Sequence, residues 1–153
     1  MNIGQEKLDE LVGNGNLELC PPNVEGAYAL IRKAETHHVT AEGLAEADPE
    51  IAMDALHAGN RKALESVLLV RGLRATKAGG HIAPLEAVRA MVGGGALRVY
   101  NVVRQLRHAG DYSNATSRVD PQDIKDNLED SKNLVSACKK ALDLLPPFVR
   151  GRR

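Results

Sequence analysis

One segment near the C-terminal end restricts the fold of this chain more than any other. Beyond Asp120, apolar or small residues recur in steps of four and three, which is the spacing of one face of an α-helix, at Ile124, Leu128, Ser131, Val135, Cys138, Leu142 and Leu145. Asp120 can cap this helix, Pro121 is tolerated in its first turn, and Pro146-Pro147 would end it. The pattern predicts a long amphipathic helix in which Cys138 has a packing role.

The rest of the chain is also predicted to be helical. Asn23 can cap a helix over residues 24–47, whose weak point is the poor helix propensity of residues 36–40. Asp48 starts a second helix that is expected to end near Thr76. Further helices are expected over residues 84–92 and 96–112, with the break Gly93-Gly94-Gly95 between them. No run alternates as a strand would, so the sequence predicts an all-α fold, a four- to five-helix up-and-down bundle.

Length and composition indicate a single domain. The 153 residues are enough to bury a core without disulfide or metal staples. Residues 1–22 are polar and are expected to be a flexible N-terminal lead-in, residues 23–147 the helical domain, and residues 148–153 a basic tail. No apolar run has the length of a membrane span and no signal-peptide pattern is present, so we expect a cytoplasmic protein without a membrane partner.

Motifs of the common enzyme classes are missing from the sequence. There is no phosphate-binding glycine loop, HExxH or GxSxG, and Cys20 and Cys138 form no CxxC or Cys/His cluster. His37 and His38 are adjacent, hence on different helix faces, and are expected at the surface. His81 is expected to be a structural histidine rather than one that lines a pocket. We therefore expect no metal and no cofactor.

Charge is distributed unevenly although the formal net charge is zero. Residues 1–60 carry 3 Lys/Arg against 11 Asp/Glu, residues 61–107 carry 9 against 2, and residues 108–153 carry 8 against 7. The zero total argues against an indiscriminate nucleic-acid binder. The basic middle can either meet an anion or pair with the acidic first third.

The segment 98–112 combines charge, polarity and periodicity as no other part of the chain does. At about 100° per residue, one arc of a helix is apolar and the opposite arc is charged. The apolar arc is Val99, Val102, Val103 and Leu106, and the charged arc is Arg104, Arg107, His108 and Asp111, with Tyr112 at its edge and Asn101 as a supporting polar residue. Charged residues three or four positions apart are neighbours on a helix surface, so two guanidiniums, an imidazole and a carboxylate converge.

These residues resemble a known family. The run Gly72-Leu73-Arg74-Ala75, then Gly79-Gly80-His81, then residues 104–112 and a long final helix, is similar to the HEPN superfamily, small all-helical domains of prokaryotic defence and toxin-antitoxin systems. The resemblance covers roughly residues 24–145. It implies a homodimer in which the motif helices of two subunits face each other, so that Arg104 and Arg107 of both chains form a phosphate-binding site, with an antitoxin or a nucleotidyltransferase as a partner protein.

The resemblance also implies a metal-independent endoribonuclease, with Arg107, His108 and Tyr112 at the catalytic positions. Active members carry an Arg, a polar residue and, a few residues further on, a His. Arg107-His108 matches the first two positions, but with four residues between it and Arg107 this chain has Tyr112 instead of His. A phenol with a pKa of about 10 is a poor general base at neutral pH.

Three functions remain open at the level of sequence. In the first, the arginines bind RNA or a nucleotide phosphate, Asp111 holds an arginine in place and Tyr112 adds a hydrogen bond. In the second, the same cluster is an interface of a non-catalytic protein-protein interaction module. In the third, His108 supports ribonuclease activity. Against all three stands an ordinary solvated helix face, where an Arg/Asp pair contributes less than about 1 kcal/mol.

Overall fold

Six helices and one small sheet make up the part of the chain that the computed structural model describes, residues 3–112 and 119–151, with only the backbone over residues 109–112. The helices are α1 (Gln5–Gly13), α2 (Val24–Leu44), α3 (Pro49–Val70), α4 (Ile82–Val92), α5 (Arg98–Tyr112) and α6 (Pro121–Leu142). The strands are β1 (Leu17–Leu19) and β2 (Leu73–Ala75). The mostly helical class is confirmed, with one helix more than the bundle of four or five that we predicted.

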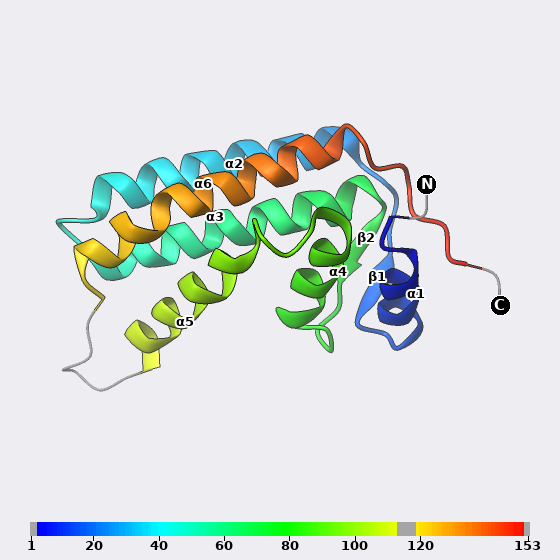
Figure 1. Cartoon of the computed structure of the whole chain (residues 1–153), viewed down its shortest axis with the longest axis horizontal. Coiled ribbons are helices and arrows are strands. Elements are labelled where there is room, and N and C mark those ends of the chain that lie inside the picture. The colour runs from blue at the N-terminus through cyan, green and yellow to red at the C-terminus, as the bar shows by residue number, and fades with distance from the viewer. Residues whose placement is uncertain (1–2, 113–118, 152–153) are drawn as a thin grey trace.

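Three long helices, α2, α3 and α6, lie side by side and form the main bundle (Figure 1). Side-chain caps fix their starts, as the sequence predicted. The Asn23 side chain accepts from the Gly26 N–H at 2.8 Å, and the Asp48 side chain accepts from the Ile51 N–H at 3.2 Å. At the start of α6, the Asp123 carboxylate accepts from the Asp120 N–H at 2.9 Å.

A buried row of hydrogen-bonded polar side chains connects the three helices of the bundle. His38 on α2 is only 2% exposed, and its Nε2 lies 2.9 Å from Oδ1 of Asn60 on α3. The Asn60 Nδ2 in turn donates to Oγ of Ser131 on α6 at 3.1 Å. The prediction that His38 lies at the surface is therefore wrong, because it continues the buried face of α2 and finds a hydrogen-bond partner there. The same packing keeps α2 helical through residues 36–40, the expected weak point.

Gly59 of α3 makes this packing possible. A Cβ at this position would lie 2.6 Å from His38 Cδ2 and 3.0 Å from the backbone oxygen of Ala34. The glycine therefore serves close helix approach, although it weakens intrinsic helix propensity.

The small sheet corrects two predictions, that the chain has no strand and that the second helix reaches Thr76. α3 ends at Val70, Gly72 turns the chain with φ +78°, and β2 pairs antiparallel with β1, Leu17 opposite Ala75 and Leu19 opposite Leu73. Strands of three residues are too short to show a convincing alternation. Their pairing joins segments more than fifty positions apart, which local sequence does not reveal.

Both ends of the described chain pack against the corner formed by the end of α3. Residues 1–22, predicted as a flexible lead-in, contain α1 and β1, which bury Leu8, Leu11 and Leu17. In the segment predicted to be a basic tail, the Phe148 N–H donates to the Arg71 carbonyl at 2.8 Å, and the Arg71 guanidinium lies 5.6 Å from the Phe148 ring centroid.

The elements β2, α4 and α5 pack against α3, and α4 and α5 also contact α6 (Figure 1). α3 is thus the central helix of the molecule. The glycine break ends α4 at Gly93, with φ +100°, and separates it from α5, as predicted. Across the described residues, no helix is both long and apolar enough to pass through a membrane.

Candidate functional site

The orientation of α5 differs from the one that its sequence predicted. Tyr100 is 1% exposed and Val103 is fully buried, whereas Val102, assigned to the apolar arc, is 43% exposed. The buried arc is therefore rotated toward Tyr100. Positions four and seven residues after Tyr100 fall on nearly the same side of a helix, and these are Arg104 and Arg107. Both arginines are consequently half-buried beside the neighbouring helices instead of pointing to the opposite, solvated side.

Arg107 connects α5 to α3. Its Nε lies 3.2 Å from Oδ1 of Asp54, and both side chains are 40% exposed. Because the pair is well exposed to water, it contributes at most about 1 kcal/mol to stability. Asp111, the carboxylate we expected to hold an arginine, and Tyr112 belong to α5, but their side chains lie outside the described residues. His108 is exposed at the surface next to Arg107.

Arg104 lines a second, separate feature. Together with Asn101 it borders a hollow of about 220 Å³ between α5 and α4, whose other walls are His81, Ile82, Leu85, Glu86 and Arg89. Two guanidiniums, an amide and an imidazole thus supply hydrogen-bond donors around a space of this size, against one carboxylate. This set of donors suits a phosphate group.

His57 on α3 is a residue of this region that sequence reasoning missed. It is 9% exposed, and its ring centroid lies 5.5 Å from that of Tyr100. Burial, which has the largest effect, and the nearby charges of Arg107, Arg61 and Arg104 together lower its pKa to about 4. The imidazole is therefore neutral at physiological pH.

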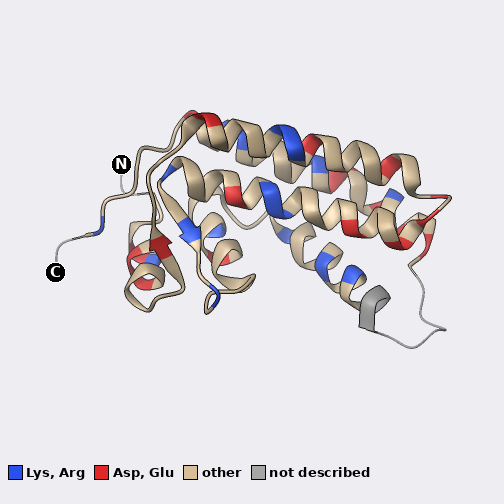
Figure 2. Ribbon diagram, turned by 180° about the vertical axis from the view of Figure 1, so that it is seen from behind, with Lys and Arg blue, Asp and Glu red and all other residues tan. Residues whose placement is uncertain are grey.

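We call Arg61, Arg104 and Arg107 the arginine cluster, because all three act electrostatically on His57 from two different helices. Figure 2 shows basic positions along the coloured part of α5, residues 98–108. Arg61 lies on the same helix as His57, four positions along. Arg61 comes near Arg104 and Arg107 only because α5 packs against α3. The spacing of residues within α5 therefore could not reveal it.

Two buried polar atoms of this region have no hydrogen-bond partner among the described residues, His57 Nδ1 and the Tyr100 hydroxyl oxygen. Buried groups of this kind are rare in proteins and each asks for an explanation. His81, predicted to be structural, lines the hollow beside Arg104, and burial and the Arg104 charge lower its pKa. Within the described ranges, no three His, Cys, Asp or Glu side chains are grouped closely enough to hold a metal ion.

Comparisons with known proteins give no identity. No family model matches the chain, and no curated protein and no solved structure matches it either.

Proposed function

We propose that this chain is a HEPN-like helical protein that binds RNA or a nucleotide phosphate through the arginine cluster, acting as a homodimer in a toxin-antitoxin or defence system. The observation that carries the proposal is the hollow beside Arg104, lined by the donors Asn101, His81 and Arg89, in a region where the charges of Arg107, Arg61 and Arg104 all act on the buried His57. Guanidinium groups bind phosphate oxygens through charge-assisted hydrogen bonds, often two at a time.

Arg104 and Arg107 contribute to this function in different ways. Arg104 lies beside the small hollow with the donors Asn101, His81 and Arg89, so it is the residue best placed to receive a phosphate. Arg107 contacts Asp54 and therefore also orients α5 against α3. Loss of Arg104 should thus affect binding alone, whereas loss of Arg107 also removes a contact between helices and can change the fold as well as the binding.

A non-catalytic protein-protein interaction module is the second candidate. It is favoured by the large apolar side chains exposed beside the charged ones, Val102 on α5 at 43% and Ile82 on α4 at 59%. Apolar side chains rimmed by charge are typical of interfaces with another protein. In this case a second copy, an antitoxin or a nucleotidyltransferase would cover α4 and α5.

The test uses labelled single-stranded RNA in EDTA, with the wild-type protein and the variants Arg104→Gln, Arg107→Gln, His108→Gln and Arg32→Gln. Arg32 is an exposed arginine of α2 and serves as the matched control. The proposal predicts a mobility shift that Arg104→Gln weakens and Arg32→Gln preserves. Cleavage that requires Arg107 and His108 would identify a metal-independent ribonuclease despite Tyr112.

The second candidate makes a different prediction. If neither a shift nor cleavage occurs, replacing Val102 by Glu should lower the oligomeric mass measured by sedimentation. An unchanged mass would contradict the interaction module, since a buried interface does not tolerate an unpaired charge.

A further inference from the structure

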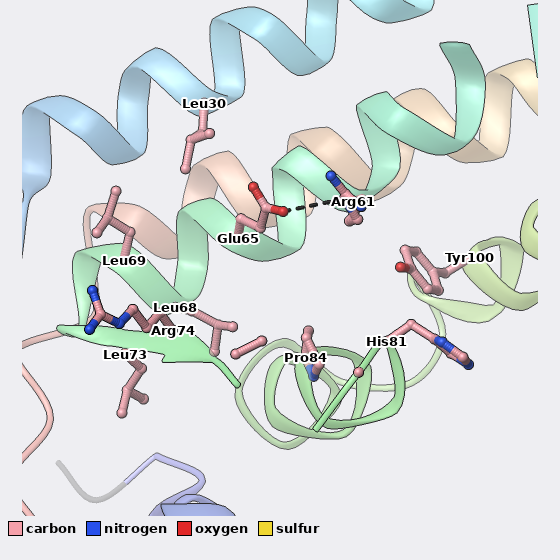
Figure 3. A pocket seen from close by; sticks show the side chains of 12 residues that line it. Leu30, Arg61, Glu65, Leu68, Leu69, Leu73, Arg74, His81, Pro84 and Tyr100 are labelled. Carbon is pink, nitrogen blue, oxygen red and sulfur yellow. Dashed lines mark ion pairs between the residues drawn. The ribbon is translucent and has the colours of Figure 1, made fainter. Parts of the chain in front are cut away.

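A larger cavity, of about 600 Å³, lies between α3, β2 and the start of α4, with one wall from α5 (Figure 3). Its volume is in the range of roughly 300–1,000 Å³ that small-molecule sites occupy. The residues at its two ends differ in chemistry. Leu68, Leu69 and Leu73 lie at one end, while Arg61, Tyr100 and His81 lie at the other (Figure 3).

The apolar end offers a hydrocarbon surface. Leu30 of α2 and Pro84 of α4 add to the three leucines. Arg74 is the one charged residue at this end, and its Nε contacts Glu18 Oε1 of β1 at 2.5 Å. Its charge is thus already balanced by a neighbouring carboxylate, which leaves the leucines as the dominant feature.

The polar end presents a hydrogen-bond donor. The Tyr100 side chain is 1% exposed, its hydroxyl has no partner among the described residues, and Figure 3 shows that hydroxyl pointing into the cavity. Burial raises the pKa of Tyr100, so the hydroxyl keeps its proton at neutral pH and needs an acceptor. An oxygen of a bound molecule would supply that acceptor.

The charges around the hydroxyl favour an acceptor that is an anion. The guanidiniums of Arg61, Arg104 and Arg107 act on Tyr100, against the single carboxylate of Glu65. Arg61 and Glu65 both line the cavity and lie 3.3 Å apart, one helical turn from each other. Because the Arg61 side chain is 55% exposed, its pair with Glu65 is weak and Arg61 can turn toward a second anion at little cost.

We propose that this cavity binds a small amphipathic carboxylic acid. Its carboxylate accepts from the Tyr100 hydroxyl and lies near Arg61, and its hydrocarbon part covers Leu68, Leu69 and Leu73. This cavity is separate from the hollow beside Arg104, which lies between α4 and α5, although His81 lines both and Arg61 of the arginine cluster lines the cavity.

Titration with octanoate, below the concentration at which it forms micelles, tests the proposal. Calorimetry and amide chemical shifts of the wild-type protein should show saturable 1:1 binding, with shifts concentrated around residues 61–75 and 81–84. Tyr100→Phe keeps the ring and removes the donor, so the Kd should rise about tenfold or more, the effect of one hydrogen bond to a charged group. Tyr28→Phe, on α2, is the matched control and should leave the Kd unchanged.

The exposed Arg61 and the half-buried Glu65 test the charge of the head group. Arg61→Gln should weaken octanoate binding several-fold and Glu65→Gln should strengthen it, while 1-octanol, which has no charge, should respond to neither. Acetate, which has no hydrocarbon chain, should not bind. Octanoate binding that does not saturate, or a Kd that is the same in Tyr100→Phe and Arg61→Gln as in the wild type, would overturn the proposal.

Discussion

A histidine is buried on each of the two sides of α3, and the two regions differ in whether their buried polar atoms have hydrogen-bond partners. On the bundle side, His38 is bonded to Asn60, which is bonded to Ser131, so every member of this row has a partner. On the α5 side, His57 Nδ1 and the Tyr100 hydroxyl have none among the described residues, and three arginines act on this pair. A satisfied polar network fixes how helices pack, whereas unsatisfied polar groups beside a cavity are more typical of a site that meets a ligand.

Asn60→Ala should cause the largest loss of stability, because it removes the partner of both His38 and Ser131. Two buried polar groups left without a partner, together with the small cavity, should lower the free energy of unfolding by about 3 kcal/mol. Urea denaturation measures this. The corresponding change on the α5 side of α3 is His57→Leu. It should alter the free energy of unfolding by less than about 1 kcal/mol, because no hydrogen bond of Nδ1 is lost. Equal losses would remove the contrast between the two sides.

Acid should destabilise the protein through His57. Its pKa in the folded protein is about 4, below the value of about 6.5 expected in the unfolded chain, so between these values the unfolded chain binds more protons. This contribution is fully present above pH 6.5 and is lost as the pH falls toward 4, by roughly 2–3 kcal/mol. Burial also lowers the pKa of His38, which acts in the same direction. Denaturation at several pH values should show that His57→Leu removes part of this slope; an unchanged slope would contradict the assignment.

Gly59→Ala should destabilise the bundle side by about 2 kcal/mol, because the new methyl group meets His38 and the Ala34 carbonyl in a packed core. Gly43→Ala on α2 is the matched control. A Cβ at Gly43 meets nothing within 4 Å, so the same change should stabilise by about 0.5–1 kcal/mol through helix propensity. Thermal unfolding of the two variants should therefore shift in opposite directions, and a parallel shift would show that close approach at Gly59 is unimportant.

Tyr100→Phe should have only a small effect on stability, and it should stabilise the protein where Asn60→Ala destabilises it. Removing a buried hydroxyl without a partner should raise the free energy of unfolding by up to about 1 kcal/mol. Tyr28→Phe should lower it slightly, since the Tyr28 hydroxyl bonds to Asp143. A clear loss of stability in Tyr100→Phe would mean that its hydroxyl is satisfied within the protein, which would also remove the reason for a ligand there.

Much of the bundle could be predicted from the sequence, because its determinants are local. The caps Asn23, Asp48 and Asp120 and the apolar repeat of α6 are patterns within single segments. The small sheet and α1 could not, since β1 has three residues and acquires its structure from β2, far along the chain. The burial of His38 was missed for a related reason: its partner Asn60 lies on another helix.

The surroundings of the candidate site could be predicted only in part, and its role stays a prediction. Arg104, Arg107 and Asn101 do lie on the side of α5 that faces neighbouring elements, but the rotation of α5 toward Tyr100 follows from packing against α3 and not from its own sequence. Asp54, His57 and Arg61 were missed because they belong to α3. The HEPN resemblance, the homodimer and the ribonuclease activity stay predictions.

The salt dependence of single-stranded RNA affinity is the measurement that tests the central claim most directly. A phosphate contact of Arg104 predicts that Arg104→Gln weakens binding at low salt and reduces the slope of log K against log salt concentration by about one, while Arg32→Gln leaves both unchanged. If Arg104→Gln binds RNA with the affinity and the slope of the wild type, the arginine cluster is not a phosphate site.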